Sequence, residues 1–158
     1  MKRMVAMAMA MTMILSAGAA TAALKGSADV VRATAATSVV TGTAGERVEF
    51  AIELDISKTW HVYAHGDTNY IGVDLTPSEG FPLQEMEAEY PQGHEGEFFG
   101  DKVYTIDGTS PIKASALIPA GLAKGEHKLE FGVTVQACDD KTCLAPTDLP
   151  VTVKLKVQ

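Results

Sequence analysis

The sequence predicts an all-β fold, and three observations lead to that expectation. Apolar and polar residues alternate strictly in three segments, which is the period of a strand with one buried face. Shorter apolar segments lie between Gly, Pro, Asp and Ser turn signals, and no convincing helical pattern is present. Seven or eight short strands, with turns about every 8 to 12 residues, fit an immunoglobulin-like β-sandwich, with a barrel as the second choice.

The three alternating segments are residues 48–56, 129–137 and 149–157. The last two lie close together in the sequence, so we expect them to pair as a hairpin. Shorter strand candidates, in chain order, are residues 30–40, 60–64, 70–76, 102–106 and 112–117. No repeat, internal linker or low-complexity tract divides these strands, so the sequence predicts one domain over residues 23–158.

The first 22 residues have the pattern of a secretory signal peptide. Lys2 and Arg3 give a short positive region, residues 4–15 are apolar, and Ala20-Thr21-Ala22 is a small-residue cleavage site. An apolar run of about a dozen residues is shorter than the roughly 20 that a membrane-spanning helix needs. The sequence therefore predicts an exported protein that is cleaved near Ala22 and is not inserted in the membrane.

Charge and motif content exclude several classes of function. Removing Lys2 and Arg3 takes the formal net charge from −7 to about −9, which argues against nucleic acid or an anionic lipid surface as a partner. There is no G-x-S-x-G elbow, no H-E-x-x-H zinc motif, no phosphate loop and no dinucleotide fingerprint. The sequence predicts no cofactor, and the chemistry is expected at the cysteines.

Cys138 and Cys143 are the only cysteines, and in an exported protein a disulfide is their default state. Continuing the alternation of residues 129–137 places Cys138 on the face opposite the core, so we expect its sulfur near the surface. A ring of about six residues restricts the unfolded chain by only ~2 kcal/mol. A structural bridge and a reactive one therefore both remain open on spacing alone.

The charges around the pair refine the reactive interpretation. Asp139 and Asp140 lie beside the first thiol and disfavour its thiolate form, and Lys141 offsets them only in part. Such a pair suits a carrier that exchanges with a partner supplying the low-pKa thiol, rather than a self-activated nucleophile. The spacing differs from the C-x-x-C of thioredoxin-like sites, and no βαβ pattern surrounds it.

Several motifs resemble the N-terminal periplasmic domain of the DsbD family. The segments V-Q-A-C (residues 135–138) and C-L-A-P (residues 143–146) resemble the family's Y-Q-x-C…C-x-P-P signature, with Val135 and Ala145 as departures. The resemblance extends over roughly residues 45–157. It includes W-H-V-Y (residues 60–63), Gly80-Phe81, Tyr90-Pro91 and H-E-G-E-F-F-G (residues 94–100).

The resemblance implies a role for both cysteines and for a covering loop. The family is an immunoglobulin-like domain that takes electrons from a membrane reductant system, through a thioredoxin-like domain, and passes them to periplasmic disulfide proteins. Cys138 and Cys143 match its redox pair. Residues 97–100 match its cap loop, which implies that Phe98 shields the disulfide and that Phe99 is partly packed.

Other matches implied by the resemblance are supporting residues. Tyr63 matches an active-site tyrosine, and His61 stands where the family often has another. Glu97, in the cap segment, is a candidate for tuning the thiols or relaying a proton to them. The loop between the cysteines is one residue shorter than in the best-known members, and Gly96 replaces a common acidic residue.

The first functional hypothesis is therefore a periplasmic thiol:disulfide interchange module, a protein-disulfide reductase component if active. The family's membrane and C-terminal thioredoxin-like domains do not occur in this sequence. The expected partners are accordingly thioredoxin-like redox proteins and a separate membrane thiol reductase. Two alternatives stay open. One is a non-catalytic exported β-sandwich binding module with a structural disulfide, and the other is a metal-binding domain using His61, His65 and His94 with a cysteine or Asp67.

Overall fold

The computed structural model describes residues 26–67 and 69–158, so the predicted signal peptide lies outside the described residues. The described chain is built of strands, preceded by one short 3₁₀ helix, η1 (Ser27–Asp29). The strands are β1 (Val31–Ala35), β2 (Val39–Gly42), β3 (Arg47–Ile56), β4 (His61–Tyr63), β5 (Asp74–Pro77), β6 (Gln84–Glu89), β7 (His94–Phe98), β8 (Asp101–Ile106), β9 (Thr109–Leu117), β10 (Gly125–Val135), β11 (Ala137–Cys138) and β12 (Thr147–Val157).

Two four-stranded sheets pack face to face as an immunoglobulin-like sandwich. One sheet has the order β1-β3-β9-β6 and the other has the order β2-β12-β10-β5. The apolar positions of the alternating strands meet between them, and Phe50 of β3 lies 5.4 Å from Phe131 of β10, measured between ring centroids. The predicted all-β sandwich is confirmed, because one face of each long strand is apolar and finds its partner in the opposite sheet.

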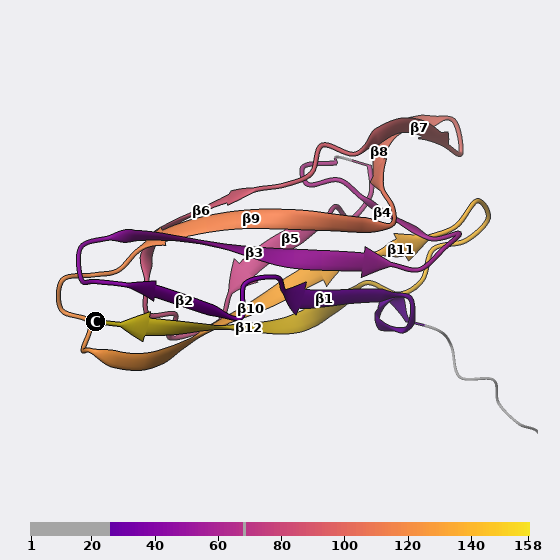
Figure 1. The fold of residues 1–158 in the computed structure, drawn as a ribbon. Coiled ribbons are helices and arrows are strands. Elements are labelled where there is room, and N and C mark those ends of the chain that lie inside the picture. Colours follow the sequence, from indigo (N-terminus) through magenta and orange to yellow (C-terminus); the bar gives the residue numbers. More distant parts are fainter. Residues whose placement is uncertain (1–25, 68) are drawn as a thin grey trace, which may run out of the picture.

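A third four-stranded sheet, of order β11-β4-β8-β7, lies at one end of the sandwich. Figure 1 shows this sheet at the end opposite the C-terminus, next to the loop that follows β11. Strand β11 continues the direction of β10 after Gln136 and pairs with β4 instead of β12. The chain therefore leaves the sandwich and enters the third sheet at the first cysteine.

The strand predictions are confirmed where alternation is long. Strand β3 matches residues 48–56, and β10 and β12 pair as the expected antiparallel hairpin from Gly125↔Val157 to Val135↔Thr147. The predicted strand over residues 30–40 is divided instead into β1, which pairs with β3, and β2, which pairs in parallel with β12. The prediction for residues 70–76 holds only from Asp74 onward.

Strands β6 and β7 were not expected from the sequence. Every residue of β6 is exposed or half-buried, and only Phe98 of β7 is buried. Edge strands with two polar faces lack the alternation by which strands are recognised. No helix among the described residues is long and apolar enough to cross a membrane.

Candidate functional site

Cys138 and Cys143 form a disulfide at the end of the sandwich that the third sheet occupies. Their Cα atoms lie 4.0 Å apart, and the two residues face each other as an isolated antiparallel bridge. Backbone hydrogen bonds flank the bridge, from Asp139 N to Thr142 O (2.9 Å) and from Leu144 N to Ala137 O (2.8 Å). The disulfide therefore joins two chain segments that the backbone already holds together.

The two cysteines differ sharply in burial. Cys138 is 0% exposed, whereas Cys143 is half-buried. The expectation that the Cys138 sulfur lies near the surface is wrong, although the alternation assigns its side chain to the correct face. That face is covered by a second hydrophobic cluster, made of Tyr63, Phe98 and Val103 from the third sheet. Alternation identifies the face of a strand but not what packs on it.

Asp139 organises the short loop between the cysteines. Its Oδ1 accepts hydrogen bonds from the backbone N–H groups of Lys141 and Thr142, each 2.8 Å long. These two donors, Lys141 first, hold the pKa of the Asp139 carboxyl below its usual value, so the loop carries a fixed negative charge next to Cys138. The turn is an Asx-type turn, which gives a four-residue loop a defined shape.

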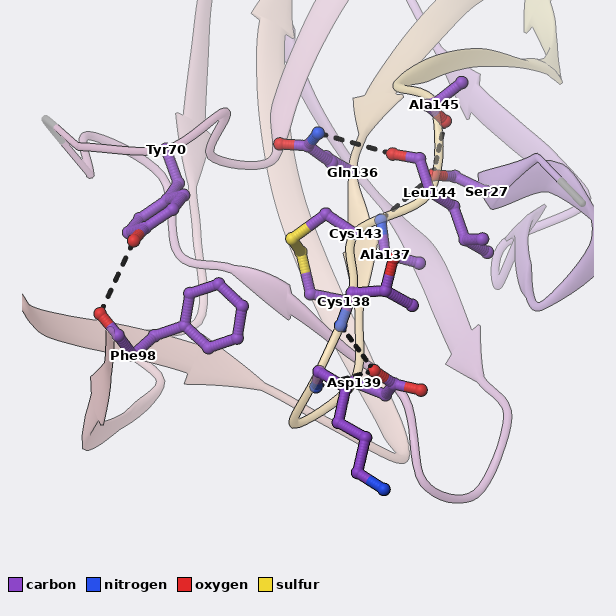
Figure 2. The surroundings of a disulfide bond; sticks show 12 residues. Ser27, Tyr70, Phe98, Gln136, Ala137, Cys138, Asp139, Cys143, Leu144 and Ala145 are labelled. Atoms are coloured by element: carbon purple, nitrogen blue, oxygen red, sulfur yellow. Dashed lines mark hydrogen bonds between the residues drawn. A yellow bond between two sulfur atoms is a disulfide. The ribbon is translucent and has the colours of Figure 1, made fainter. Parts of the chain in front are cut away.

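Ser27 fixes both ends of the cysteine loop from the other end of the sequence. Its hydroxyl accepts a hydrogen bond from Ala137 N (2.9 Å) and donates one to Ala145 O (2.7 Å), and its own N–H also donates to Ala145 O (3.2 Å). Ser27 is completely buried, and Gln136 Nε2 adds a bond to Leu144 O (3.3 Å). Figure 2 shows this network behind the disulfide.

The expected cap is the tip of the β7–β8 hairpin. Phe98 and Asp101 are register partners, and Phe99 and Gly100 between them both have positive φ angles, which is the geometry of a tight type I′ turn. Phe98 is only 9% exposed and packs in the same cluster as Cys138. Figure 2 shows the Phe98 ring beside the disulfide. Phe99 contacts the Phe98 ring but stays 79% exposed, so it packs less than expected.

Aromatic rings hold Phe98 in this place. Its ring centroid lies 5.4 Å from that of Tyr70, 6.2 Å from that of Tyr63 and 6.3 Å from that of His61, each with the rings edge to face. The Tyr70 hydroxyl lies 3.4 Å from Phe98 O and 3.3 Å from Asp101 Oδ2, so its single proton is shared between them. Tyr70 was not selected from the sequence, because it matched no motif.

Tyr63 lies beneath the cap and is fully buried. Its ring stacks on Tyr70 with centroids 4.4 Å apart, and its hydroxyl has no hydrogen-bond partner in the structure. Burial first, and then the charges of Tyr70 and Asp67, raise the pKa of Tyr63 to about 12. Tyr63 therefore stays protonated at neutral pH and acts as a wall of the site rather than as a base.

His61 and Glu97 line a cleft of about 430 Å³ between β7 and the cysteine loop, together with Phe99 and Asp140. Glu97 is exposed, and His61 is half-buried. Burial lowers the pKa of His61, and the nearby carboxylates of Asp140, Asp107 and Asp139 oppose that shift in this order. The cleft gives solvent a route to the edge of the disulfide site.

Comparisons with known proteins agree with this site. The family model described as "Thiol:disulfide interchange protein DsbD, N-terminal" matches residues 27–154. This chain belongs to the DsbD N-terminal family. No curated protein sequence matches the chain. Family membership together with the disulfide-bonded pair supports a thiol:disulfide interchange module.

Solved structures support the fold of this DsbD N-terminal family member. The N-terminal periplasmic domain of ScsB from Proteus mirabilis is similar at a TM-score of 0.54 and 13% identity, over 80% of this chain and 45% of that chain. The chain thus spans less than half the length of that relative. A family 123 glycoside hydrolase from Clostridium perfringens (TM-score 0.40, 7% identity, 80% and 27% covered) and the periplasmic chaperone SfaE (0.32, 13%, 81% and 56%) are more distant.

The histidines proposed as an alternative metal site take part in other contacts. His65 Nδ1 lies 3.0 Å from Val73 O and 3.3 Å from Asp74 Oδ1, and its ring stacks on Tyr90. His94 is exposed at the start of β7. Over residues 26–67 and 69–158, no group of three or more His, Cys, Asp or Glu side chains is placed to hold a metal ion.

Proposed function

We propose that this chain is a periplasmic thiol:disulfide interchange module that carries electrons between thioredoxin-like proteins through Cys138 and Cys143. The observation that carries the proposal is the asymmetric cover of the disulfide. Cys138 is fully buried beneath the Phe98 cap, whereas Cys143 keeps part of its surface in solvent. In a disulfide arranged in this way, the Cys143 sulfur is more accessible to attack than the Cys138 sulfur.

The position of the bridge favours a redox role over a structural one. Cys138 and Cys143 are five positions apart, on segments that backbone hydrogen bonds and Ser27 already connect. Closing so short a ring restricts the unfolded chain by only ~2 kcal/mol. A bridge placed to stabilise a sandwich would connect its two sheets, as in antibody domains.

The exchange follows from this asymmetry. The thiolate of a reduced donor attacks Cys143 Sγ, a bond forms between the two proteins, and the Cys138–Cys143 bond breaks with its electron pair on Cys138 Sγ, which takes up a proton. The second thiol of the donor then displaces Cys143 and closes the donor's own disulfide. The donor is oxidised, and this chain leaves with two thiols that reduce the next disulfide by the reverse steps.

The cap must move aside before a protein partner reaches Cys143. Phe98 is held by ring contacts and by the bond that Tyr70 shares with its carbonyl, without a charged interaction of its own. Edge-to-face aromatic pairs contribute about 0.5–1.5 kcal/mol each, so an opened cap is within reach of the contacts that a docking protein supplies. The cap therefore slows reduction of the disulfide by small thiols, which supply no docking contacts, and opens for a partner protein that does supply them.

A trapping experiment tests the proposal. In the Cys138→Ala variant, Cys143 has no internal partner, so it should form a persistent mixed disulfide with a periplasmic thioredoxin-like protein that keeps only its attacking cysteine. Cys143→Ala should form little of it because Cys138 is buried. In parallel, the reduction potential of the wild-type pair should lie in the roughly −270 to −120 mV range of redox carriers. A potential below about −300 mV and no trapped partner would identify a structural disulfide in a binding module.

A further inference from the structure

His61 is the residue directly opposite Cys138 in the third sheet. Strands β4 and β11 are antiparallel, with Val62 paired to Ala137 and His61 paired to Cys138. Val62 and Ala137 belong to the main core, so His61 and Cys138 share the other face, on which Phe98 and Tyr63 lie. Side chains directly opposite each other in such a pair have Cβ atoms about 4.5–5.5 Å apart. His61 is thus the residue directly across the strand pair from Cys138.

One nitrogen of His61 has no partner among the residues that the structure describes. Nε2 is buried and makes no hydrogen bond to them, and the ring centroid lies 5.7 Å from that of Tyr63 and 6.3 Å from that of Phe98. A buried polar atom without a partner costs stability and calls for an explanation. A disulfide sulfur carries no proton, but a Cys138 thiol does, so reduction of the bridge creates a donor on the residue directly opposite His61.

The charges around His61 suit a proton acceptor. Burial lowers the pKa of its imidazole, so the ring is mainly neutral at neutral pH and free to take a proton. Asp139 and Asp140 of the cysteine loop and Asp107 after β8 favour the imidazolium that then forms. Glu97 faces the same cleft from β7, and Tyr63 on the same strand stays protonated. The cleft lets the proton leave to solvent.

Cys138 needs such an acceptor. Its side chain is fully buried and precedes Asp139 and Asp140 in the chain, and burial and nearby negative charge both disfavour a thiolate. A protonated thiol is a poor nucleophile, and a positioned base overcomes this. Among the described residues, His61 is the titratable side chain paired with Cys138 in the sheet.

We propose that His61 is the base that removes the proton of Cys138 when this cysteine resolves a mixed disulfide between Cys143 and an oxidised partner. The inference rests on the proposed function. In this step Cys138 Sγ attacks Cys143 Sγ, the proton of Cys138 passes to His61 Nε2, and the bond from Cys143 to the partner breaks. The partner's sulfur leaves with the electron pair and is reduced, the internal disulfide re-forms, and the proton on His61 passes to the leaving thiolate or to solvent.

Stopped-flow oxidation of the reduced protein by dithiodipyridine separates the two cysteines. Cys143 attacks the probe and releases a first equivalent of coloured thiopyridone, and Cys138 then closes the disulfide and releases a second. In the wild type we expect the second phase to slow as the pH falls below the pKa of His61, because the base becomes protonated. In His61→Gln, which cannot take the proton, the second phase should slow about a hundredfold at neutral pH, the lower end of general base effects.

Controls keep the result specific. The first phase should be unchanged in His61→Gln, and His94→Gln, an exposed histidine on β7, should leave both phases unchanged. Cys138→Ala should release a single equivalent. A second phase in His61→Gln with wild-type rate and pH profile overturns the inference, as does loss of both phases together with the fold. Failure of the proposed function shows separately, as wild-type protein that accepts no electrons from a thioredoxin-like donor.

Discussion

At the disulfide, burial divides the work between two chemically identical residues. Cys143 keeps contact with solvent, and Cys138 is closed off by Phe98, Tyr63 and Val103. Asp139 keeps its charge through two backbone donors, which disfavours a thiolate on the neighbouring Cys138 in the absence of a base. On the proposed function, this difference in burial favours first contact at Cys143 and leaves Cys138 dependent on its surroundings.

The buried hydroxyl of Tyr63 lowers the stability of the fold, and a single substitution can measure by how much. Its hydroxyl is buried without a hydrogen-bond partner, and such a group costs about 1–3 kcal/mol. Tyr63→Phe keeps the ring stacked on Tyr70 and removes the unpaired group, so we expect the free energy of unfolding in urea to rise by about 1 kcal/mol. A fall in stability would mean that the hydroxyl has a bonded partner in solution.

Individual residue roles were only partly accessible from the sequence. The disulfide was predicted from the two cysteines of an exported chain, and the structure confirms it. The motif at residues 97–100 singled out Phe98, which is buried in the cluster that contains Cys138, and its shielding role stays a prediction. The prediction that Cys138 is exposed was wrong because its burial depends on β7 and β8, which are formed by residues 94–106. Tyr70 carries no motif, and its part in the site comes only from its position next to Phe98 and Tyr63.

At the scale of elements, the β7–β8 hairpin is the part of the site that the proposed function requires to move. Strand β7 is an edge strand with exposed residues up to Phe98, and it pairs only with β8 among the described strands. The alternation rule identifies strands that bury a face, so it found β3, β10 and β12 and missed β6 and β7. This mainly polar strand pairs along its whole length with β8, and Phe98 at its end packs in the cluster that contains Cys138.

The packing of Phe98 predicts how fast small thiols reduce the disulfide. Phe98→Ala removes ring contacts with Tyr63, Tyr70 and His61, each worth about 0.5–1.5 kcal/mol, so the open state gains roughly tenfold or more in population. Reduction of the disulfide by dithiothreitol should accelerate by about the same factor. Phe99→Ala, at the exposed neighbouring position, is the matched control and should react at nearly the wild-type rate. Equal rates for Phe98→Ala and wild type would exclude a shielding role.

At the scale of the whole molecule, the sandwich is a rigid support and the third sheet is the site built on it. The long strands β10 and β12 run from the core towards the cysteine loop, which connects β11 to β12. The sandwich was predictable because its strands alternate over nine or more residues. The contacts that join distant parts of the chain were not predictable, since no local pattern marks a serine at residue 27 as a partner of residues 137 and 145.

Substitution of Ser27 tests this connection between the two ends of the sequence. Ser27→Ala leaves the buried Ala137 N–H without its acceptor and removes one donor to Ala145 O, so we expect the free energy of unfolding to fall by about 1–3 kcal/mol. The exposed Ser57→Ala should change stability by less than about 0.5 kcal/mol.

Because Ser27 clamps both ends of the cysteine loop, hydrogen exchange of the Ala137 amide should also accelerate in Ser27→Ala while amides of the β3–β9 pair keep wild-type protection. Uniform acceleration across the sandwich would contradict a local clamp and would instead make η1 part of the global folding unit.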